Sequence, residues 1–360
     1  MKKITIVLTS FLILISGCKK EVKPTNENKN FDVPQLLLEV THQIILPTLR
    51  NFDLEASRLD DFAEIYVNES NENNLKVLRD QWTTTALAYE RTYNFHIGKA
   101  KSLFINRAIN NWPTVPNSIE NFIENNEINE ESVKAISPQI KAIPAIEYLL
   151  FETDISSANE KFEQSPKRKQ YLKLATKFLK LQSNRLLNIW KEEGKNYTKT
   201  FIDNNGSGIN ESFNMLFNGL YNSVNTSKVT KIGKPGGLEN SPRANPDLVQ
   251  APYSQESLKL LSESIKVIEE VFFTEKHSNI SQYISSISKD NLINDRISKS
   301  IIEINQAIEA IPVPLEEAVI SHPKEVEMLH SKLTALNVWI AVDARNILSV
   351  IITSTDTDGD

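Results

Sequence analysis

Apolar residues recur along this chain at the spacing of one helical face. After Ser254, a predicted N-cap, five apolar residues follow at intervals of 3, 4, 3 and 4, and they are Leu258, Leu261, Ile265, Ile268 and Phe272. Such spacing lays an apolar stripe along a helix of about five turns, and only a facing helix could cover that stripe. Three further segments carry the same pattern: Leu75, Leu78, Trp82, Thr85, Tyr89 and His96; Tyr171, Leu174, Phe178 and Leu181; and Leu329, Leu333, Leu336, Ile340, Ile347 and Val350.

The pattern predicts an all-α fold built from two antiparallel helical bundles. Period-two alternation between tight turns is missing, and the ten glycines cluster in the non-periodic stretches. Helices are expected at residues 33–68 with a bend at Pro47, and at 72–97, 132–152, 167–193, 209–228, 254–275, 297–311 and 323–353. Two long irregular stretches, 110–129 and 228–252, lie between them, and loops of that length are typically functional or disordered.

The first residues are typical of a bacterial lipoprotein signal. A short basic head is followed by an apolar run, Ile4–Ile15, which is too short to cross a bilayer, and then by Ser16, Gly17 and Cys18. We expect residues 1–17 to be removed and Cys18 to carry lipid. An ordinary secretory signal that happens to contain a cysteine is the alternative. Cys18 is the only cysteine in the chain, which excludes an intramolecular disulfide.

The rest of the chain reads as a tethered soluble domain. Residues 18–31 are expected to form a disordered tether, because residues 19–29 contain almost nothing apolar except Val22. The remaining length exceeds the usual size of a single core, so we expect one bundle at 32–160 and another at 161–360, with the boundary near 153–166. Lipid on Cys18 would make a membrane the first partner, and the expected location is the bacterial cell envelope, on the outer membrane facing the periplasm or the cell surface.

The charged residues argue against two classes of function. The net charge of −6 is spread along the chain without a basic block, so no surface is expected to neutralise phosphates, and we predict no nucleic-acid partner. The five histidines show no H-x-x-H or H-E-x-x-H spacing, and no G-x-S-x-G motif is present. Helical zinc sites and serine hydrolysis therefore have no support in the sequence.

One segment resembles a known family motif. Residues Lys141–Phe151 read K-A-I-P-A-I-E-Y-L-L-F. This is similar to the segment G-x-H-x-x-E followed by Y-L-L-F in the imelysin family, also called insulin-cleaving membrane peptidases, in which the histidine and the glutamate are the supposed metal ligands. Here the three motif positions hold Ala142, Pro144 and Glu147. Because proline has no donor atom, a His/Glu metal pair cannot form from this motif.

Four other segments resemble the same family and follow its order. They are W-T-T-T-A-L-A-Y-E-R-T-Y-N-F-H-I-G at 82–98, N-W-P-T-V-P-N-S-I at 111–119, K-I-G-K-P-G-G at 231–237 and T-D-T-D-G-D at 355–360. The resemblance covers the chain after the signal. It implies two helical bundles related as a degenerate duplication, together with an association with iron acquisition.

Two further positions depart from the family pattern. Tyr93 stands where the family has a second glutamate, and Ala86 stands where it has an arginine. Tyrosine is a poor zinc ligand at neutral pH because its proton must leave, whereas ferric iron accepts phenolate. No cofactor is predicted firmly, and iron is the candidate. The candidate ligand-binding residues are Tyr89, Glu90, Tyr93, His96, Glu147 and Asp343.

Several of these residues also have a structural interpretation. If Pro144 begins a helix, Glu147 lies in the first turn, where a carboxylate is favoured without any ligand. Asp343 could pair with Arg345, pair with a neighbouring helix, or face the cleft between the bundles. Tyr89 could belong to the core, and His96 could be a cation at a helix end.

The sequence therefore favours a non-catalytic binding lipoprotein of the envelope, with iron or a small iron complex in a cleft between the bundles. One alternative is a metallopeptidase, which the family name supports and the lost histidine disfavours. The other is an interaction protein whose site has decayed and which binds other envelope proteins.

Overall fold

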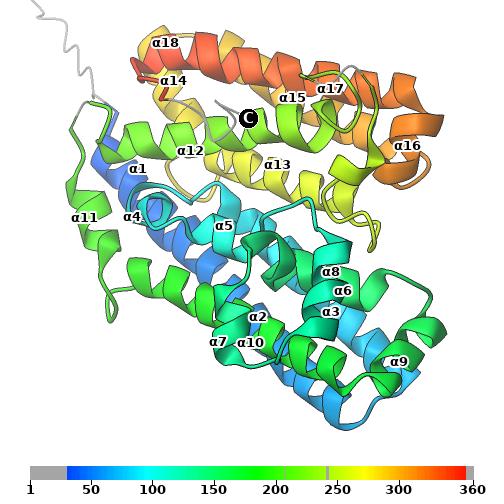
Figure 1. The fold of residues 1–360 in the computed structure, drawn as a ribbon. Coiled ribbons are helices and arrows are strands. Elements are labelled where there is room, and N and C mark those ends of the chain that lie inside the picture. Colours follow the sequence, from blue (N-terminus) through cyan, green and yellow to red (C-terminus); the bar gives the residue numbers. More distant parts are fainter. Residues whose placement is uncertain (1–30, 207, 241–242, 354–360) are drawn as a thin grey trace, which may run out of the picture. The chain divides into compact units, whose positions relative to one another are not determined.

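The computed structural model describes residues 31–206, 208–240 and 243–353, drawn in colour in Figure 1. The predicted signal at 1–17, the lipidated Cys18, nearly all of the tether and the terminal T-D-T-D-G-D lie outside the described residues. Residues from Phe31 onward form one compact unit. None of the described helices is both long enough and apolar enough to cross a lipid bilayer.

Eighteen α-helices run along the described chain. The first nine are α1 (Val33–Val40), α2 (Leu46–Asn68), α3 (Glu72–Tyr93), α4 (Gly98–Ser102), α5 (Ile105–Ile109), α6 (Pro116–Asn125), α7 (Glu130–Ala135), α8 (Ala142–Phe151) and α9 (Ile155–Gln164). The other nine are α10 (Pro166–Trp190), α11 (Tyr197–Asp203), α12 (Ser212–Thr226), α13 (Ser257–Phe273), α14 (Ile280–Ser288), α15 (Leu292–Glu309), α16 (Leu315–Ser321), α17 (Pro323–Val338) and α18 (Arg345–Leu348). The described residues contain no strand, so the all-α prediction is confirmed.

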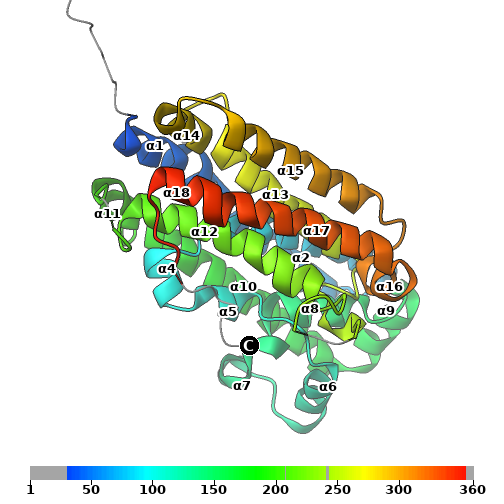
Figure 2. The same ribbon diagram turned by 90° about the horizontal axis from the view of Figure 1, so that it is seen from above.

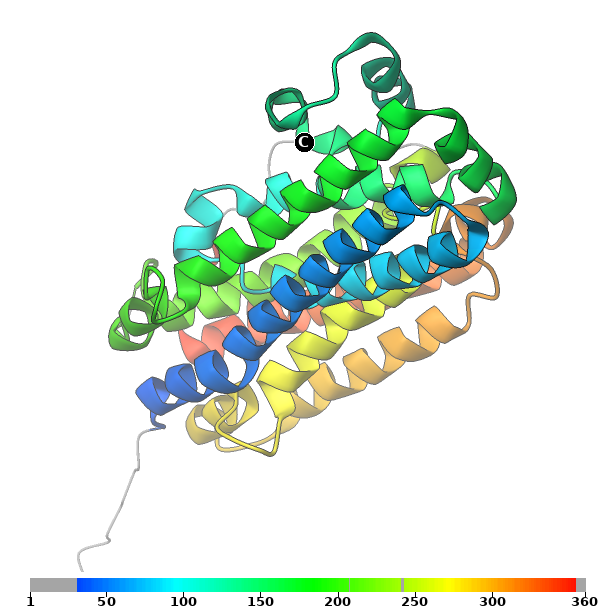
Figure 3. The same ribbon diagram turned by 90° about the horizontal axis from the view of Figure 1, so that it is seen from below.

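The long helices pack in two groups. In the first, α2 lies against both α3 and α10, and α8 packs on α3 and α10 (Figure 3). In the second, α13, α15, α17 and α12 lie beside one another (Figure 2). Contact between α3 and α13 connects the two groups. The division at residue 160 stays a prediction; α10, which that boundary assigns to the second bundle, packs on α2 of the first.

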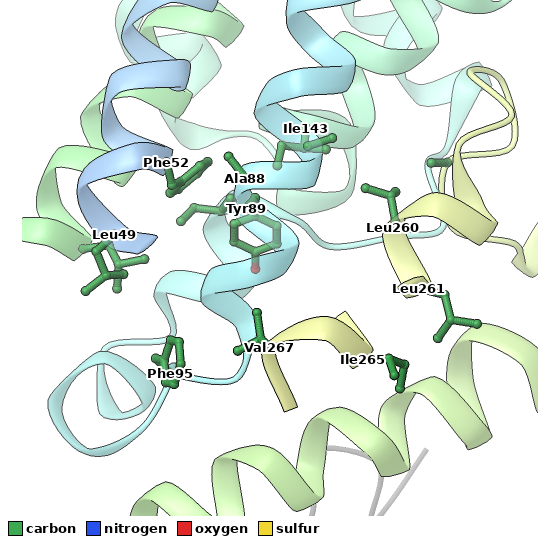
Figure 4. Close-up of a cluster of buried hydrophobic side chains, with 14 of the residues drawn as sticks. Leu49, Phe52, Ala88, Tyr89, Phe95, Ile143, Leu260, Leu261, Ile265 and Val267 are labelled. Atoms are coloured by element: carbon green, nitrogen blue, oxygen red, sulfur yellow. The ribbon is translucent and has the colours of Figure 1, made fainter. Parts of the chain in front are cut away.

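Apolar stripes on α2, α3, α8 and α13 meet in the core. Figure 4 shows Phe52 and Tyr89 side by side, with Ile143 of α8 above them and Val267 of α13 below. All four side chains are at most 4% exposed. Burying each large apolar side chain contributes on the order of 1.5–3 kcal/mol, so the predicted stripes are what hold the helices together.

The helix predicted at 33–68 is not regular α-helix before Pro47. Residues Thr41–Ile45 are π-helical, and the N–H of Leu46 donates to the carbonyl of Thr41, five residues earlier. Proline has no N–H to donate to the carbonyl four residues before it, so the α-helical pattern cannot continue unchanged through this point. The wider π turn accommodates the missing donor.

Other predicted boundaries are wrong. The helix expected at 132–152 is divided into α7, a short 3₁₀ turn at Pro138–Ile140, and α8. The stretch at 110–129, predicted to be irregular, contains α6. Residues 153–166, near which the two predicted bundles divide, contain α9, and the position of that division stays a prediction. Ser254 does not cap a helix, because α13 begins at Ser257 and its N-cap is Glu256.

The start of α8 contains a strained residue. Ala142 has a φ of 56°, in the left-handed region, and it is fully buried. An L-residue there costs roughly 1–2 kcal/mol, whereas glycine adopts this conformation freely. Pro144 is the third residue of the helix, where a missing N–H does no harm because the first N–H groups of a helix have no partner within it.

We therefore expect Ala142→Gly to raise the free energy of unfolding by about 1 kcal/mol, because it relieves the left-handed strain. Ala145→Gly is the matched control, since Ala145 is also buried, lies in the same helix and has ordinary helical geometry. It should lower stability by about 1 kcal/mol or more. Urea unfolding of both variants measures the difference, and equal destabilisation would contradict this account of Ala142.

Candidate functional site

A small cavity lies where α3, α8 and the segment before α13 meet. Its volume is about 10 Å³, which is about the space of one water molecule. It is lined by Ala86, Glu90, Asn110, Trp112, Ile143, Pro144, Glu147, Gln250, Ala251 and Leu260. Gln250 is 3% exposed, and its Oε1 has no hydrogen-bond partner among the described residues. The cavity thus brings Glu90 and Glu147 together and holds an unsatisfied polar atom.

Glu147 enters this cavity from the second turn of α8. It is 2% exposed, and its Oε1 accepts hydrogen bonds from the N–H of Tyr253 (2.9 Å), the N–H of Ser254 (2.9 Å) and the Ser254 hydroxyl (3.0 Å). The interpretation of Glu147 as a first-turn cap is therefore wrong. Its carboxylate fixes the segment before α13 to α8, and Ser254 donates two of the hydrogen bonds that do so.

Burial decides the protonation of Glu147. Removal from water raises the pKa of its carboxyl to about 7, although the three hydrogen bonds lower it. The nearby carboxylate of Glu316 adds a smaller upward effect. Burial therefore brings the titration of this carboxyl into the range of neutral pH.

Glu90 is held differently, because a cation accompanies it. The Nζ of Lys231 lies 2.5 Å from Glu90 Oε2, and the Ser264 hydroxyl donates to the same oxygen at 2.9 Å. The amide of Gln250 donates to the other oxygen, Oε1. Glu90 is 1% exposed and Lys231 is 4% exposed, so this is an ion pair in the interior.

The other predicted site residues do not line the cavity. Tyr89 belongs to the core of Figure 4, with its ring centroid 5.3 Å from that of Phe52. The Tyr93 hydroxyl lies 3.3 Å from the hydroxyl of Thr226. Asp343 is half-buried in a π-helical segment at Trp339–Ala344. These three residues lie outside the proposed site.

His96 is also outside the cavity. It is 8% exposed, and burial lowers its pKa to about 3. Its imidazole is therefore neutral at pH 7, so it does not provide the cationic helix end considered from the sequence.

A larger groove lies beside the cavity, and we call it the proline groove. Its volume is about 530 Å³, and it is lined by Pro113, Thr114, Val115, Pro116, Asn117, Pro246, Asp247, Val249, Pro252, Tyr253 and Glu316. Three of these side chains are acidic or phenolic and none is basic. Glu316, in α16, is half-buried, and its Oε2 has no hydrogen-bond partner among the described residues. Burial raises the pKa of its carboxyl.

The cavity and the groove share their neighbours along the chain. Trp112 lines the cavity and Pro113 lines the groove, and the same relation holds for Ala251 and Pro252. Both features therefore depend on the placement of two segments, 112–117 and 246–253, which the sequence pattern predicted to be irregular.

Comparison with known proteins shows the family of this chain. The family model described as Imelysin matches residues 45–340, which is most of the chain. This chain belongs to the imelysin family. No curated protein matches it.

Two solved structures share the imelysin fold of this chain. One is a protein of Parabacteroides distasonis that carries the name "putative iron-regulated protein A precursor", with a TM-score of 0.74, 17% identity, and coverage of 91% of this chain and 97% of that one. The other is an imelysin-like protein of Psychrobacter arcticus, with a TM-score of 0.71, 17% identity, and coverage of 89% and 97%. At this identity the likeness concerns the fold.

The cavity does not fit the metal that the family motif implies. Ala86 and Pro144, which replace the arginine and the histidine of the motif, both line it and offer no side-chain donor. The described residues contain no group of three His, Cys, Asp or Glu side chains placed to hold a metal ion. Glu90 is already occupied by an ammonium group. A protein-held metal ion therefore lacks ligands here.

Sequence reasoning missed the partners of both glutamates. Lys231, Gln250 and Ser254 lie 141, 160 and 107 residues from the glutamates that they bind. The resemblance at 231–237 was the available signal for Lys231. Nothing in the local pattern pointed to Gln250.

The buried carboxyl of Glu147 makes stability depend on pH. Its pKa is 4.5 when exposed and about 7 in the fold, so the folded state holds the proton more tightly. Below pH 4.5 the carboxyl is protonated in both the folded and the unfolded state, so it does not change the free energy of unfolding with pH. As pH rises from 4.5 to about 7, the free energy of unfolding falls, and the fall levels off at higher pH. We expect the loss of unfolding free energy between pH 5 and pH 8 to be smaller in Glu147→Gln, by on the order of 1 kcal/mol or more.

Urea unfolding at the two pH values measures this difference. Glu127→Gln is the control, because Glu127 is exposed, and it should show the pH dependence of the natural protein. Equal pH dependence in all three proteins would show that Glu147 does not titrate in this range.

Proposed function

We propose that this imelysin-family protein is a non-catalytic binding protein of the bacterial envelope, attached through lipid on Cys18. The observation that carries the proposal is the proline groove with the Glu316 carboxyl, whose Oε2 has no hydrogen-bond partner among the described residues and which lies near the buried Glu147. The volume of the groove, about 530 Å³, is in the range of small-molecule sites. Its prolines and the Tyr253 ring supply apolar walls, while its acids supply charge.

The chemistry of the groove favours a positively charged ligand. Asp247, Glu316 and the Tyr253 hydroxyl are oxygen donors, and no lysine or arginine lines the groove. Carboxylate and phenolate oxygens suit ferric iron. Because the described residues offer no three-residue metal cluster, the ligand we propose is an iron complex that brings ligands of its own. The name of the Parabacteroides distasonis protein is consistent with a connection to iron.

Hydrolysis has less support. The cavity holds no pair of free metal ligands, and Glu147 accepts three hydrogen bonds where a metal-bound water would need a base. The small size of the cavity supports a second candidate function, an interaction protein with a decayed site that binds another envelope protein. In that case the proline groove and its loop would form the contact surface.

Ligand binding can be tested by calorimetric titration of the purified protein with ferric iron, ferrous iron, haem and ferric siderophore complexes. We expect saturable binding of one complex. Glu316→Gln should weaken it about tenfold or more, which corresponds to about 1.4 kcal/mol for the loss of a charge that the ligand pairs with. Glu317→Gln is the matched control, since Glu317 is exposed, adjacent in α16 and outside the groove. The absence of binding to all of these ligands would remove the proposal.

Peptidase activity can be tested on unfolded protein substrates with and without zinc. We expect no zinc-dependent cleavage, because the motif histidine is Pro144 and Glu90 is paired with Lys231. The control is Glu147→Gln. Cleavage that requires zinc and disappears in this variant would reverse the order of the two functions.

A further inference from the structure

Lys231 lies against Glu90, one of the two glutamates that line the cavity. It lies in a π-helical segment, Ser227–Gly233, that continues from α12. Its Nζ is 2.5 Å from Glu90 Oε2 and 3.2 Å from the hydroxyl of Ser264. The side chains of Lys231 and Glu90 are 5% and 2% exposed, so water does not screen the pair.

These contacts reproduce the surroundings of a bound cation. The ammonium group meets one carboxylate oxygen and one hydroxyl oxygen, and Ser264 also donates to that same carboxylate. The second oxygen of Glu90 accepts from Gln250. The carboxylate thus has a partner on each oxygen, and its charge is balanced from within the chain. A metal ion at Glu90 would lie next to the lysine charge, and like charges at such short distance repel strongly in the interior.

We propose that the Lys231 ammonium is the resident cation of the Glu90 site, occupying the place that a metal ion would otherwise take. The site is therefore complete without metal, and removal of the lysine side chain converts it into a binding site for a small external cation. The ligand class of the opened site is an alkylammonium ion or a divalent metal. This inference concerns Glu90 alone and does not depend on ligand binding in the proline groove.

Lys231 and Glu90 stabilise the fold only as a pair. A buried carboxylate without a counter-ion is strongly unfavourable, so loss of either partner alone should destabilise the fold more than loss of both. The π-helical segment directs Lys231 toward α13, and π turns are frequent where a helix places a functional side chain.

Chemical rescue tests the proposal. Lys231→Ala removes the length of a propylammonium ion, so the probe is propylammonium chloride, with 1-propanol as the uncharged control of the same length. We expect Lys231→Ala to lower Tm by about 5 °C or more. Propylammonium should restore part of that loss, whereas propanol should not. It should have no such effect on the natural protein or on Lys231→Ala combined with Glu90→Gln. Equal effects of propylammonium and propanol on Lys231→Ala, or no effect of either, would overturn the proposal.

Metal binding to the natural protein is a second, independent test of the proposal. Equilibrium dialysis against Zn²⁺ and Mn²⁺ should show no stoichiometric binding that depends on Glu90 in the natural protein. Stoichiometric binding that disappears in Glu90→Gln would overturn the proposal, because Glu90 would then be a metal ligand in spite of Lys231.

A double-mutant cycle covers the case in which Lys231→Ala does not fold. Lys231→Met keeps most of the side-chain volume without its charge. Combined with Glu90→Gln, it should give a higher Tm than Lys231→Met alone, because no unpaired charge is left in the interior. Additive losses in Tm would show that the two groups do not compensate one another and would overturn the inference.

Discussion

The hydrogen bonds to Glu147 hold together the two parts of the molecule from which the site is made. They join the second turn of α8 to backbone N–H groups 106 and 107 residues later in the chain. The segment fixed in this way supplies Gln250 to the cavity and Tyr253 to the proline groove. Burial raises the pKa of Glu147 more than these hydrogen bonds lower it. The ionised carboxyl therefore lowers the stability of the fold, although its hydrogen bonds fix the position of the segment.

Much of the fold could be predicted from the sequence, because long helices leave a visible stripe. The apolar spacing through Leu261, Ile265 and Phe272 marks α13, and all three side chains are buried. The bend predicted at Pro47 stays a prediction, whereas its cause, a proline that cannot donate within a helix, is visible as the π-helical turn directly before it. Short helices such as α6 and α9 have ten residues each, which is too few turns for periodicity to separate them from loops.

The site could be predicted only in part. Glu90 and Glu147 were chosen through the family resemblance, and they do line one cavity, whereas Tyr93 and Asp343 do not. Spacing along a chain describes neighbours on one helix, and it carries no information about partners more than a hundred residues away. That is why Lys231 could not be assigned to Glu90 before the fold was known. The two departures from the motif that both face the cavity, Ala86 and Pro144, were the most informative positions.

The buried ion pair between Lys231 and Glu90 depends on the number of residues in the π-helical segment Ser227–Gly233. A π turn holds an extra residue compared with an α turn, so it acts like a one-residue insertion in a helix. Deleting a residue between 227 and 230 would remove that extra residue, and Lys231, which lies inside the segment, would lose the backbone position from which its ammonium group reaches Glu90. The partner of the Glu90 carboxylate therefore depends on the number of residues between α12 and Lys231, as well as on their identity.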